Sequence, residues 1–271
     1  MAAKRNKDES AQKLFADELR ACRAKAGWSR EEFGPMINYS TSLVCMVENM
    51  ERWPTLEFAQ RCDEAFDRPG SFERIQVRVR SEPFPGYFRP FAIHEAEATA
   101  LYNFQVSLVP GLLQTRDYAH ALLTCPMGVT PELVEQRLNA RLERQAILDR
   151  PKPPLLWVVL DEAVLRRPVG GREVMRTQID HLIEMGRRPN IMIQIVPQTV
   201  GEYQGVNGAF VVVDFADAPS IAYLDTALTG FIIERPEHVT EVKLSYETLR
   251  ADALSPVASL STMEEVAKIW T

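Results

Sequence analysis

The sequence predicts an α+β fold, in which an all-α N-terminal domain is followed by a mixed α/β C-terminal domain. Apolar residues recur at helical spacing over about the first 80 residues, and continuous apolar runs typical of buried strands occur after residue 154. A segment rich in proline, residues 82–86, separates the two patterns. We therefore expect domains at residues 10–80 and 84–271, each long enough to bury its own core.

Two short helices joined by a tight turn are predicted between residues 28 and 50. Ser29 and Glu32 have the spacing of a capping box at the start of the first helix, and Ser40 can cap the second. Asn38 lies between them and tolerates the left-handed conformation that a sharp turn needs. The side chains expected to face inward are Phe33 and Met36 in the first helix and Val44 and Val47 in the second. Such a unit is a helix-turn-helix, although an ordinary helical hairpin has the same pattern.

A longer helix precedes this pair, and two further helical segments follow it. The first helix spans about four turns and ends at Gly27, a typical residue just beyond a helix. Pro54-Thr55 starts the next helix, which stops at residues 68–70, and a short helix or connector covers residues 71–80. The side chains expected to face inward are Leu14, Phe15, Leu19, Cys22 and Ala26 before the pair, and Leu56, Ala59, Cys62 and Phe66 after it.

With this order of helices, residues 14–70 resemble the Cro/repressor-type (xenobiotic response element, XRE) DNA-binding domain. The resemblance implies that the second helix of the pair, residues 41–49, enters the major groove of double-stranded DNA. Hydroxyl and apolar side chains would then read bases, while Arg30, Asn49 and Arg52 would contact phosphates. The full set of expected DNA-binding residues is Arg30, Ser40, Thr41, Ser42, Met46, Asn49 and Arg52. The chain departs from the family in having Pro35 inside the first helix, Met50 where glycine is common, and no Arg, Gln or Lys on the exposed face of the second helix.

The charge balance limits how the chain can bind DNA. The formal net charge is −6, and the first 80 residues hold 14 Lys/Arg against 13 Asp/Glu. A strong non-specific DNA binder carries more positive charge, so we expect a homodimer that binds two half-sites. The four cysteines lack zinc-ligand spacing and are expected to be reduced, and neither a metal nor a cofactor is expected. Without a secretion signal or an apolar run of roughly 20 residues, a cytoplasmic protein with no membrane partner is expected.

The C-terminal domain is expected to place helices before and after a mixed sheet. Strand–helix–strand is the predicted local unit at residues 155–196, and a hairpin at residues 208–224 extends the sheet. The first predicted helix covers residues 93–107, with Ala96, Ala100, Leu101 and Phe104 inward. A short helix follows the N-cap residue Thr115, and a longer one runs from the N-cap residue Thr130 to about Arg150. Further helices are predicted from Gly171 to about Met185, at residues 237–254, and at residues 262–270 with a Ser261/Glu264 capping box.

Arg137, Arg141 and Arg144 recur at helical spacing and line one side of the predicted helix after Thr130. Such a row is usually a solvated face with salt bridges. The alternative is a docking surface for an acidic partner or for a second copy of the chain, and these three arginines are the expected partner-binding residues.

Five sequence blocks of the second domain occur in a fixed order. The blocks are LVPGLLQTRDYAHALL, RLERQAIL, WVVLDEAVLRRPVGG, VMRTQIDHL and NIMIQIVP. They are similar to the C-terminal domain of unknown function in actinobacterial regulators of the WhiJ-like family, over roughly residues 92–270. The resemblance implies a transcription factor that is often paired with a small acidic protein, and it implies no particular ligand.

No catalytic motif accompanies these blocks, and we expect the chain not to be an enzyme. Asp161-Glu162 ends a predicted strand, where carboxylates could serve catalysis, yet no histidine or second acidic cluster accompanies them. The first interpretation is a DNA-binding transcriptional regulator whose C-terminal domain dimerises and binds a signal or a small partner protein. The alternative is an antitoxin-like or adaptor module, in which the helix-turn-helix contacts a protein instead of DNA.

Overall fold

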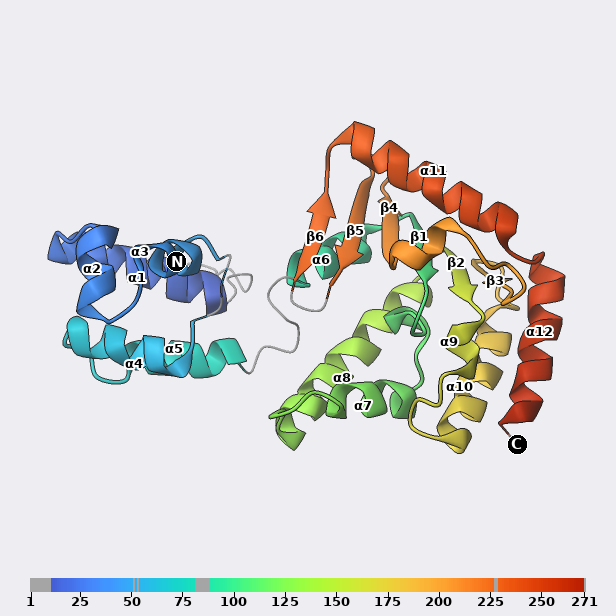
Figure 1. The fold of residues 1–271 in the computed structure, drawn as a ribbon, viewed down its shortest axis with the longest axis horizontal. Helices are drawn as coiled ribbons and strands as arrows, with labels where there is room; N and C mark the ends of the chain where they lie inside the picture. Colours follow the sequence, from blue (N-terminus) through green and yellow to red (C-terminus); the bar gives the residue numbers. More distant parts are fainter. Residues whose placement is uncertain (1–10, 51, 53, 81–87, 227–228, 271) are drawn as a thin grey trace. The chain divides into compact units, whose positions relative to one another are not determined.

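The computed structural model describes residues 11–50, 52, 54–80, 88–226 and 229–270 (Figure 1). The chain divides into two compact units, Met1–Glu82 and Pro83–Thr271. The first unit is helical, and the second combines helices with a six-stranded sheet among the described residues. The predicted α+β class is therefore confirmed.

The first unit contains five helices among its described residues. They are α1 (Ala11–Ala26), α2 (Arg30–Met36), α3 (Thr41–Glu48), α4 (Leu56–Ala65) and α5 (Ser71–Arg80). The capping box of Ser29 and Glu32 is present at the start of α2, and the Ser40 hydroxyl accepts a hydrogen bond from the Leu43 backbone N–H at the start of α3. These local signals fix where each helix begins, as the sequence predicts.

The turn between α2 and α3 depends on two backbone features. Asn38 adopts the predicted left-handed conformation, with φ of 55°. Gly34 lies inside α2 and is buried, because the turn passes directly over it. A Cβ atom at Gly34 would lie 2.9 Å from the carbonyl oxygen of Tyr39 and 3.1 Å from the backbone nitrogen of Thr41. The absent side chain is therefore what lets the two helices approach so closely.

The first core is built from aromatic rings and branched aliphatic side chains. Phe33 stacks on Phe66 with ring centroids 4.9 Å apart, and Phe15 meets the edge of Phe72 at 5.2 Å. The predicted inward positions of Met36 and Ala26 are wrong, because both residues are exposed. The inward stripe of the α2 segment runs through Phe33, Gly34 and Ile37, and the burial of α1 ends one turn before Ala26.

The second unit is a mixed sheet with the strand order β3-β2-β1-β4-β5-β6. Its strands are β1 (Ala100–Gln105), β2 (Leu155–Asp161), β3 (Ile191–Val196), β4 (Phe210–Asp214), β5 (Ile221–Asp225) and β6 (Gly230–Ile233). The first three strands are parallel to one another, whereas β4, β5 and β6 form an antiparallel meander beside β1. The predicted strand–helix–strand unit and the predicted hairpin are both present.

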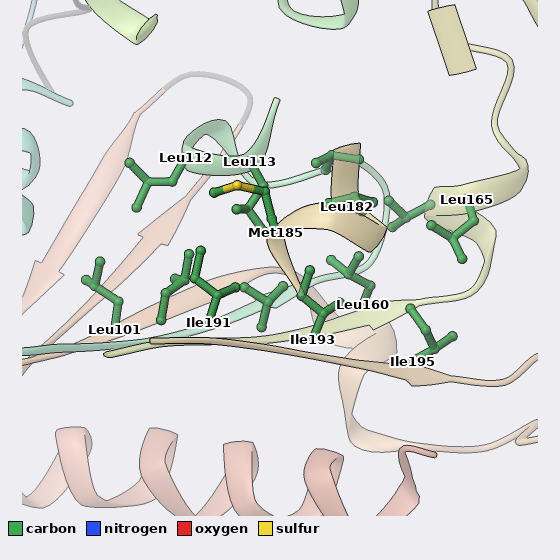
Figure 2. Packing of buried hydrophobic residues seen from close by; sticks show 14 of the residues in the cluster. Leu101, Leu112, Leu113, Leu160, Leu165, Leu182, Met185, Ile191, Ile193 and Ile195 are labelled. Atoms are coloured by element: carbon green, nitrogen blue, oxygen red, sulfur yellow. The ribbon is translucent and has the colours of Figure 1, made fainter. Parts of the chain in front are cut away.

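Helices cover both faces of this sheet. The helices are α6 (Arg89–Glu97), α7 (Arg116–Thr124), α8 (Pro131–Gln145), α9 (Ala163–Arg166), α10 (Arg172–Met185), α11 (Pro236–Asp252) and α12 (Pro256–Ile269), with short 3-10 turns η1 (Gly111–Leu113), η2 (Ala146–Leu148) and η3 (Gln204–Asn207). Helix α11 lies along one face, and α7, α8 and α10 lie on the other (Figure 1). Figure 2 shows the larger core, in which Leu160 and Ile193 of the sheet face Leu182 of α10.

The predicted helix at residues 93–107 is wrong in its second half. Helix α6 ends at Glu97, and β1 begins at Ala100. Strand β1 lies between β2 and β4, so both of its faces are covered. Leu101 belongs to the larger core, and Phe104 belongs to the smaller core under α11. A strand buried on both faces loses the polar–apolar alternation that would distinguish it from a helix.

The last helix begins earlier than predicted. Ser255, and not Ser261, caps α12 by accepting a hydrogen bond from the Ala258 backbone N–H. The Ser261 hydroxyl instead donates to the Val257 carbonyl oxygen inside the helix, which is a common alternative for serine. Helix α8 is also shorter than predicted, because it ends at Gln145 and continues only as the turn η2. Strand β6 and helix α9 were not predicted.

Replacing Gly34 by alanine is expected to destabilise the first unit by roughly 1–3 kcal/mol, because the new methyl group would press on the turn backbone. The sign of this change in the free energy of unfolding is informative, because alanine usually stabilises a helix interior by about 1 kcal/mol relative to glycine. Urea denaturation with hydrogen exchange of the α2 and α3 amides measures the change. Gly201→Ala is the control, because a Cβ atom there meets no atom within 4 Å. An unchanged unfolding midpoint in Gly34→Ala would contradict the close approach of the turn.

Candidate functional sites

Helix α3 presents one buried face and one accessible face. Val44, Val47 and Glu48 are buried against the first core. Ser42 and Asn49 are exposed, and Thr41 and Met46 are half-buried, so the side chains predicted to meet DNA lie on the accessible side. The Ser40 hydroxyl is already the cap of α3, and it keeps its own proton to donate outward. The structure thus brings these predicted residues together at one helix surface.

A buried carboxylate fixes the position of α3. The side chain of Glu48 has 0% exposure, and it accepts hydrogen bonds from Nε of Arg23 at 2.8 Å and from Nε of Arg30 at 2.6 Å. Arg20 donates to the backbone carbonyl oxygen of Glu48 at 2.8 Å. Arg20 and Arg23 belong to α1, Arg30 belongs to α2, and Glu48 belongs to α3. One acidic residue therefore joins three helices.

The charge of Glu48 is retained in spite of its burial. Burial alone would raise the pKa of Glu48, but the hydrogen bonds from Arg23 and Arg30 outweigh it and hold the pKa below its usual value. The same contact raises the pKa of Arg30. A carboxylate shared by two guanidinium groups is a charge-assisted arrangement that stays ionised at neutral pH.

Arg30, which is predicted to contact a DNA phosphate, also has a structural role in the first unit. Its Nε is committed to Glu48, while the side chain remains 37% exposed and can present its other N–H groups outward. Sequence reasoning missed Arg20 and Arg23, which lie beside it around Glu48. Their spacing of three residues on α1 and the helical spacing of Glu48 from Val44 are the signals that could have found them. The domain net charge hides this local group of arginines.

The segment after α3 carries the remaining predicted residues. Asn49 is exposed at the C-terminal end of α3, and its side-chain amide lies 3.5 Å from the sulfur of Cys45. Met50 adopts a left-handed conformation with φ of 62°, which explains why glycine is common at this position in the family it resembles. Arg52 is exposed, and its backbone N–H donates to the Met46 carbonyl oxygen. Asn49 and Arg52 therefore lie at one end of the helix that carries Ser42.

The three arginines of α8 line a cavity in the second unit and do not form a solvated face. The cavity has a volume of about 320 Å³ and is bounded by α6, α7, η1, α8 and the strands β1, β4 and β5. Arg144 is 12% exposed, forms an ion pair with Glu95 at 2.9 Å and lies 4.8 Å over the ring of Phe88. Arg141 donates to the Gln114 side-chain oxygen at 2.6 Å. The Nε atom of Arg137 is buried without a hydrogen-bond partner in the described part of the chain.

A hydrogen-bonded frame holds this arginine row. Gln114 donates to the Val109 carbonyl oxygen at 2.6 Å, while its own backbone carbonyl accepts from Gln145 at 2.8 Å. Gln145 also donates to the carbonyl oxygen of Gly111 at 2.9 Å. A Cβ atom at Gly111 would overlap Nη2 of Arg144, so glycine leaves the room that this guanidinium occupies. Two of the five sequence blocks, LVPGLLQT and RLERQ, therefore meet at the cavity.

Positive charge is in excess in this cavity. Burial, followed by the charges of Arg144 and Arg137, lowers the pKa of Arg141 to about 10, and the side chain stays protonated at neutral pH. The acidic side chains that line the cavity are Glu95 and Asp225. Burial raises the pKa of Glu95, although Arg144 opposes the shift, and burial also raises the pKa of Asp225. Both acids are thus less easily ionised than usual, whereas Arg141 keeps its charge at neutral pH.

Asp161 and Glu162, the carboxylates at the end of β2, are hydrogen-bonded to the backbone and to neighbouring side chains. Asp161 accepts from the Ala163 backbone N–H and from the Tyr203 hydroxyl. Glu162 accepts from Arg166 and from the Gln198 backbone N–H. Within the described ranges, no group of three or more His, Cys, Asp or Glu side chains could hold a metal ion, and no helix is long and apolar enough to cross a membrane. These contacts give Asp161 and Glu162 structural roles at the end of β2.

Comparisons with known protein families match both units. Residues 88–265 match the family described as a domain of unknown function (DUF5753), and residues 19–72 match a helix-turn-helix family. No curated protein and no solved structure matches the chain. The helix-turn-helix match covers α2, α3 and α4 together with part of α1, and the other match covers the sheet and the arginine-lined cavity.

Replacing Glu48 by glutamine is expected to destabilise the first unit by roughly 3 kcal/mol at pH 7, because Arg23 and Arg30 lose their shared counter-charge. The folded pKa of Glu48 is depressed, so its contribution is fully present above the unfolded value of about 4.3 and is lost as pH falls through the lower folded value. The stability gap between parent and variant should stay constant from about pH 7 to 5 and close below that.

Hydrogen exchange of the α1–α3 amides, measured across this pH range, reports the gap for the first unit alone. Glu57→Gln is the matched control, because Glu57 is exposed and pairs with Arg61 one turn along α4. A Glu48→Gln variant as stable as Glu57→Gln at pH 7 would show that the buried ion network does not hold α3.

Proposed function

Because the chain belongs to the DUF5753 family and carries an XRE-type helix-turn-helix domain, we propose that this DNA-binding transcriptional regulator acts as a homodimer whose C-terminal domain binds a signal. The observation that carries the proposal is the accessible face of α3, held at a fixed angle by the buried carboxylate of Glu48. A recognition helix reads base edges only when its scaffold fixes its angle to the groove.

A homodimer follows from the small contact surface of one chain. A single α3 covers a few base pairs, and its accessible residues Thr41, Ser42 and Met46 carry no charge. Two such helices placed about 34–36 Å apart would meet successive major grooves on one side of the duplex. Two half-sites then supply the affinity that one weakly charged unit lacks. Dimerisation is assigned to the C-terminal domain, the larger unit of the chain.

The WhiJ-like resemblance adds a small acidic protein as a further candidate partner. The positive charge of Arg137, Arg141 and Arg144 supports an acidic ligand for the C-terminal domain. Because the three side chains line a cavity, an acidic protein would have to insert a side chain or a terminus there instead of docking on a flat face. We place this candidate second, since the cavity dimensions suit a small molecule.

The residues of α3 are expected to divide into those that read sequence and those that position the protein. Ser42→Ala and Thr41→Ala should reduce discrimination between an operator and a mutated operator by roughly 1 kcal/mol, because a hydroxyl contact to a base is lost. Arg52→Ala should weaken binding to all DNA and lower the salt slope by about one unit, because a phosphate contact is lost.

Fluorescence anisotropy with DNA selected from a random pool, at two or three salt concentrations, separates these effects. Arg30→Ala is expected to act like Arg52→Ala on the salt slope, but it also loosens Glu48, so its stability is measured in parallel. Arg116→Ala, on the surface of the second unit, is the control. If the α3 variants and Arg52→Ala all match the parent on both DNAs, α3 does not read DNA, and the protein-interaction alternative applies.

The proposed dimer is tested on the same selected DNA. Light scattering at micromolar protein should show two chains on a duplex with two half-sites, because each chain supplies one recognition helix. A duplex with a single half-site should bind much more weakly. A stable complex of one chain with one half-site, at the affinity of the full operator, would rule out the dimer as the DNA-binding form.

A further inference from the structure

We propose that the cavity lined by Arg137, Arg141 and Arg144 binds a small organic anion that carries a flat apolar ring. This inference rests on the proposed signal-binding role of the C-terminal domain, and it names the chemical class of the signal. The acid group of the ligand lies against the arginine row, and the ring lies against the aromatic residues on the wall of the same cavity.

The arginine row offers donors that the protein itself does not fully use. Arg137 has a buried Nε without a hydrogen-bond partner among the described residues, and Arg141 meets a neutral partner, Gln114. Among the described residues, Arg144 is the member of the row that faces a carboxylate at close range, at 2.9 Å from Glu95. Guanidinium groups bind carboxylate and phosphate oxygens through paired N–H donors. A bound acid group would therefore satisfy both the spare donors and the spare charge.

The charge state of the cavity supports an anion over a cation. Three guanidinium groups stand beside Glu95 and Asp225, and burial raises the pKa of both acids. Burial, followed by the charges of Arg144 and Arg137, lowers the pKa of Arg141, because each of them disfavours the positive charge there. Uncompensated charge in a partly buried site is costly, and a bound anion removes that cost.

Part of the cavity wall, beginning at the Phe88 ring under Arg144, is aromatic. Phe91 and Tyr223 stack with ring centroids 4.1 Å apart, and Phe88 meets Tyr223 edge-on at 5.9 Å. These rings are held by the larger core, so they form a rigid apolar wall. A flat ring suits such a wall through stacked or edge-to-face contact. The cavity volume of about 320 Å³ corresponds to a compact ligand of this kind.

The frame around the row is built from hydrogen bonds within the chain itself. Three hydrogen bonds from Arg141 and Gln145 tie the η1 segment to α8, and a fourth, from Gln114 to Val109, closes the loop around η1. Gly111 leaves space for the Arg144 guanidinium. Preorganised donors lose little side-chain entropy on binding, so they favour affinity. Such a frame distinguishes a binding site from a chance group of surface arginines.

Isothermal titration calorimetry of the full chain without DNA tests the proposal. The probes are phenyl phosphate and phenylacetate, with benzyl alcohol as the neutral ring and inorganic phosphate as the ringless anion. At least one acidic ring probe should bind at least about tenfold more tightly than both simpler probes, because only it meets both parts of the cavity. The stronger of the two identifies the acid group. The proposal is overturned if neither acidic ring probe binds with a Kd below about 10 mM, or if benzyl alcohol binds as tightly as the acidic ring probes.

Two variants locate the bound probe. Arg137→Gln should weaken the acidic ring probe about tenfold, whereas Arg116→Gln, an exposed arginine on α7, should leave it unchanged. Ala209→Phe keeps every arginine but fills the cavity wall, and it should also weaken the ring probe. Melting curves confirm that each variant is folded. Unchanged affinity in folded Arg137→Gln or in folded Ala209→Phe overturns the assignment.

The outcome is independent of the DNA-binding tests. Probe titrations use protein without DNA, and the anisotropy experiments use DNA without probe. Loss of the ring probe in Arg137→Gln with unchanged operator binding would still support the cavity. Failure of operator binding in a chain that holds the ring probe would instead count against the DNA-binding mode, and not against the ligand class.

Discussion

The buried carboxylate of Glu48 is the interaction on which the DNA-binding unit depends. A carboxylate with no exposed surface is costly unless charged donors surround it, and here Arg23 and Arg30 supply them. Because the donors come from α1 and α2, the carboxylate is satisfied only when α3 lies at one position relative to both helices. An apolar residue at this position would pack as well, but it would leave the angle of α3 less strictly defined. The fixed angle is what a helix needs if weak contacts from Thr41 and Ser42 are to read bases.

Both units place arginines beside carboxylates, but the ratio of positive to negative groups differs between them. In the first unit one buried carboxylate is shared by two arginines, so the acid is fully satisfied and the contact is structural. In the second unit three arginines line one cavity, and within the described part of the chain Arg144 is the one that pairs closely with an acid. Gln114 orders Arg141 without neutralising it. The ion group of the first unit is complete among the described residues and joins three helices, whereas the arginines of the second unit outnumber the acids that line their cavity.

Local signals predicted most of the fold, and the largest failure, at strand β1, has a physical reason. The caps at Ser29, Ser40 and Thr130 depend on a few adjacent residues, so the sequence contains all the information they need. Strand β1 is different, because it lies at the centre of a sheet covered on both faces. Its residues Leu101 and Phe104 belong to separate cores, and an apolar run of that kind is equally compatible with a helix. The cap at Ser255 was missed because Ser261, with Glu264 three residues on, has the spacing of a capping box, whereas Ser255 has Ala258 at that position.

The candidate sites show where periodicity alone stops being informative. Helical spacing places Thr41, Ser42 and Met46 on the accessible side of α3, and it also places Arg137, Arg141 and Arg144 on one side of α8. The two helix faces differ in whether other elements pack over them, and this depends on contacts between residues far apart in the chain. Nothing in the described first unit covers the accessible face of α3, while α6 and η1 close over the arginines and bring Glu95 to Arg144. The same sequence signal therefore describes an open surface in one unit and a cavity wall in the other. Because burial lowers the effective dielectric constant around these guanidinium groups, each arginine donor in the cavity gains strength that a fully exposed arginine lacks, and this favours a small anion over an exposed protein face.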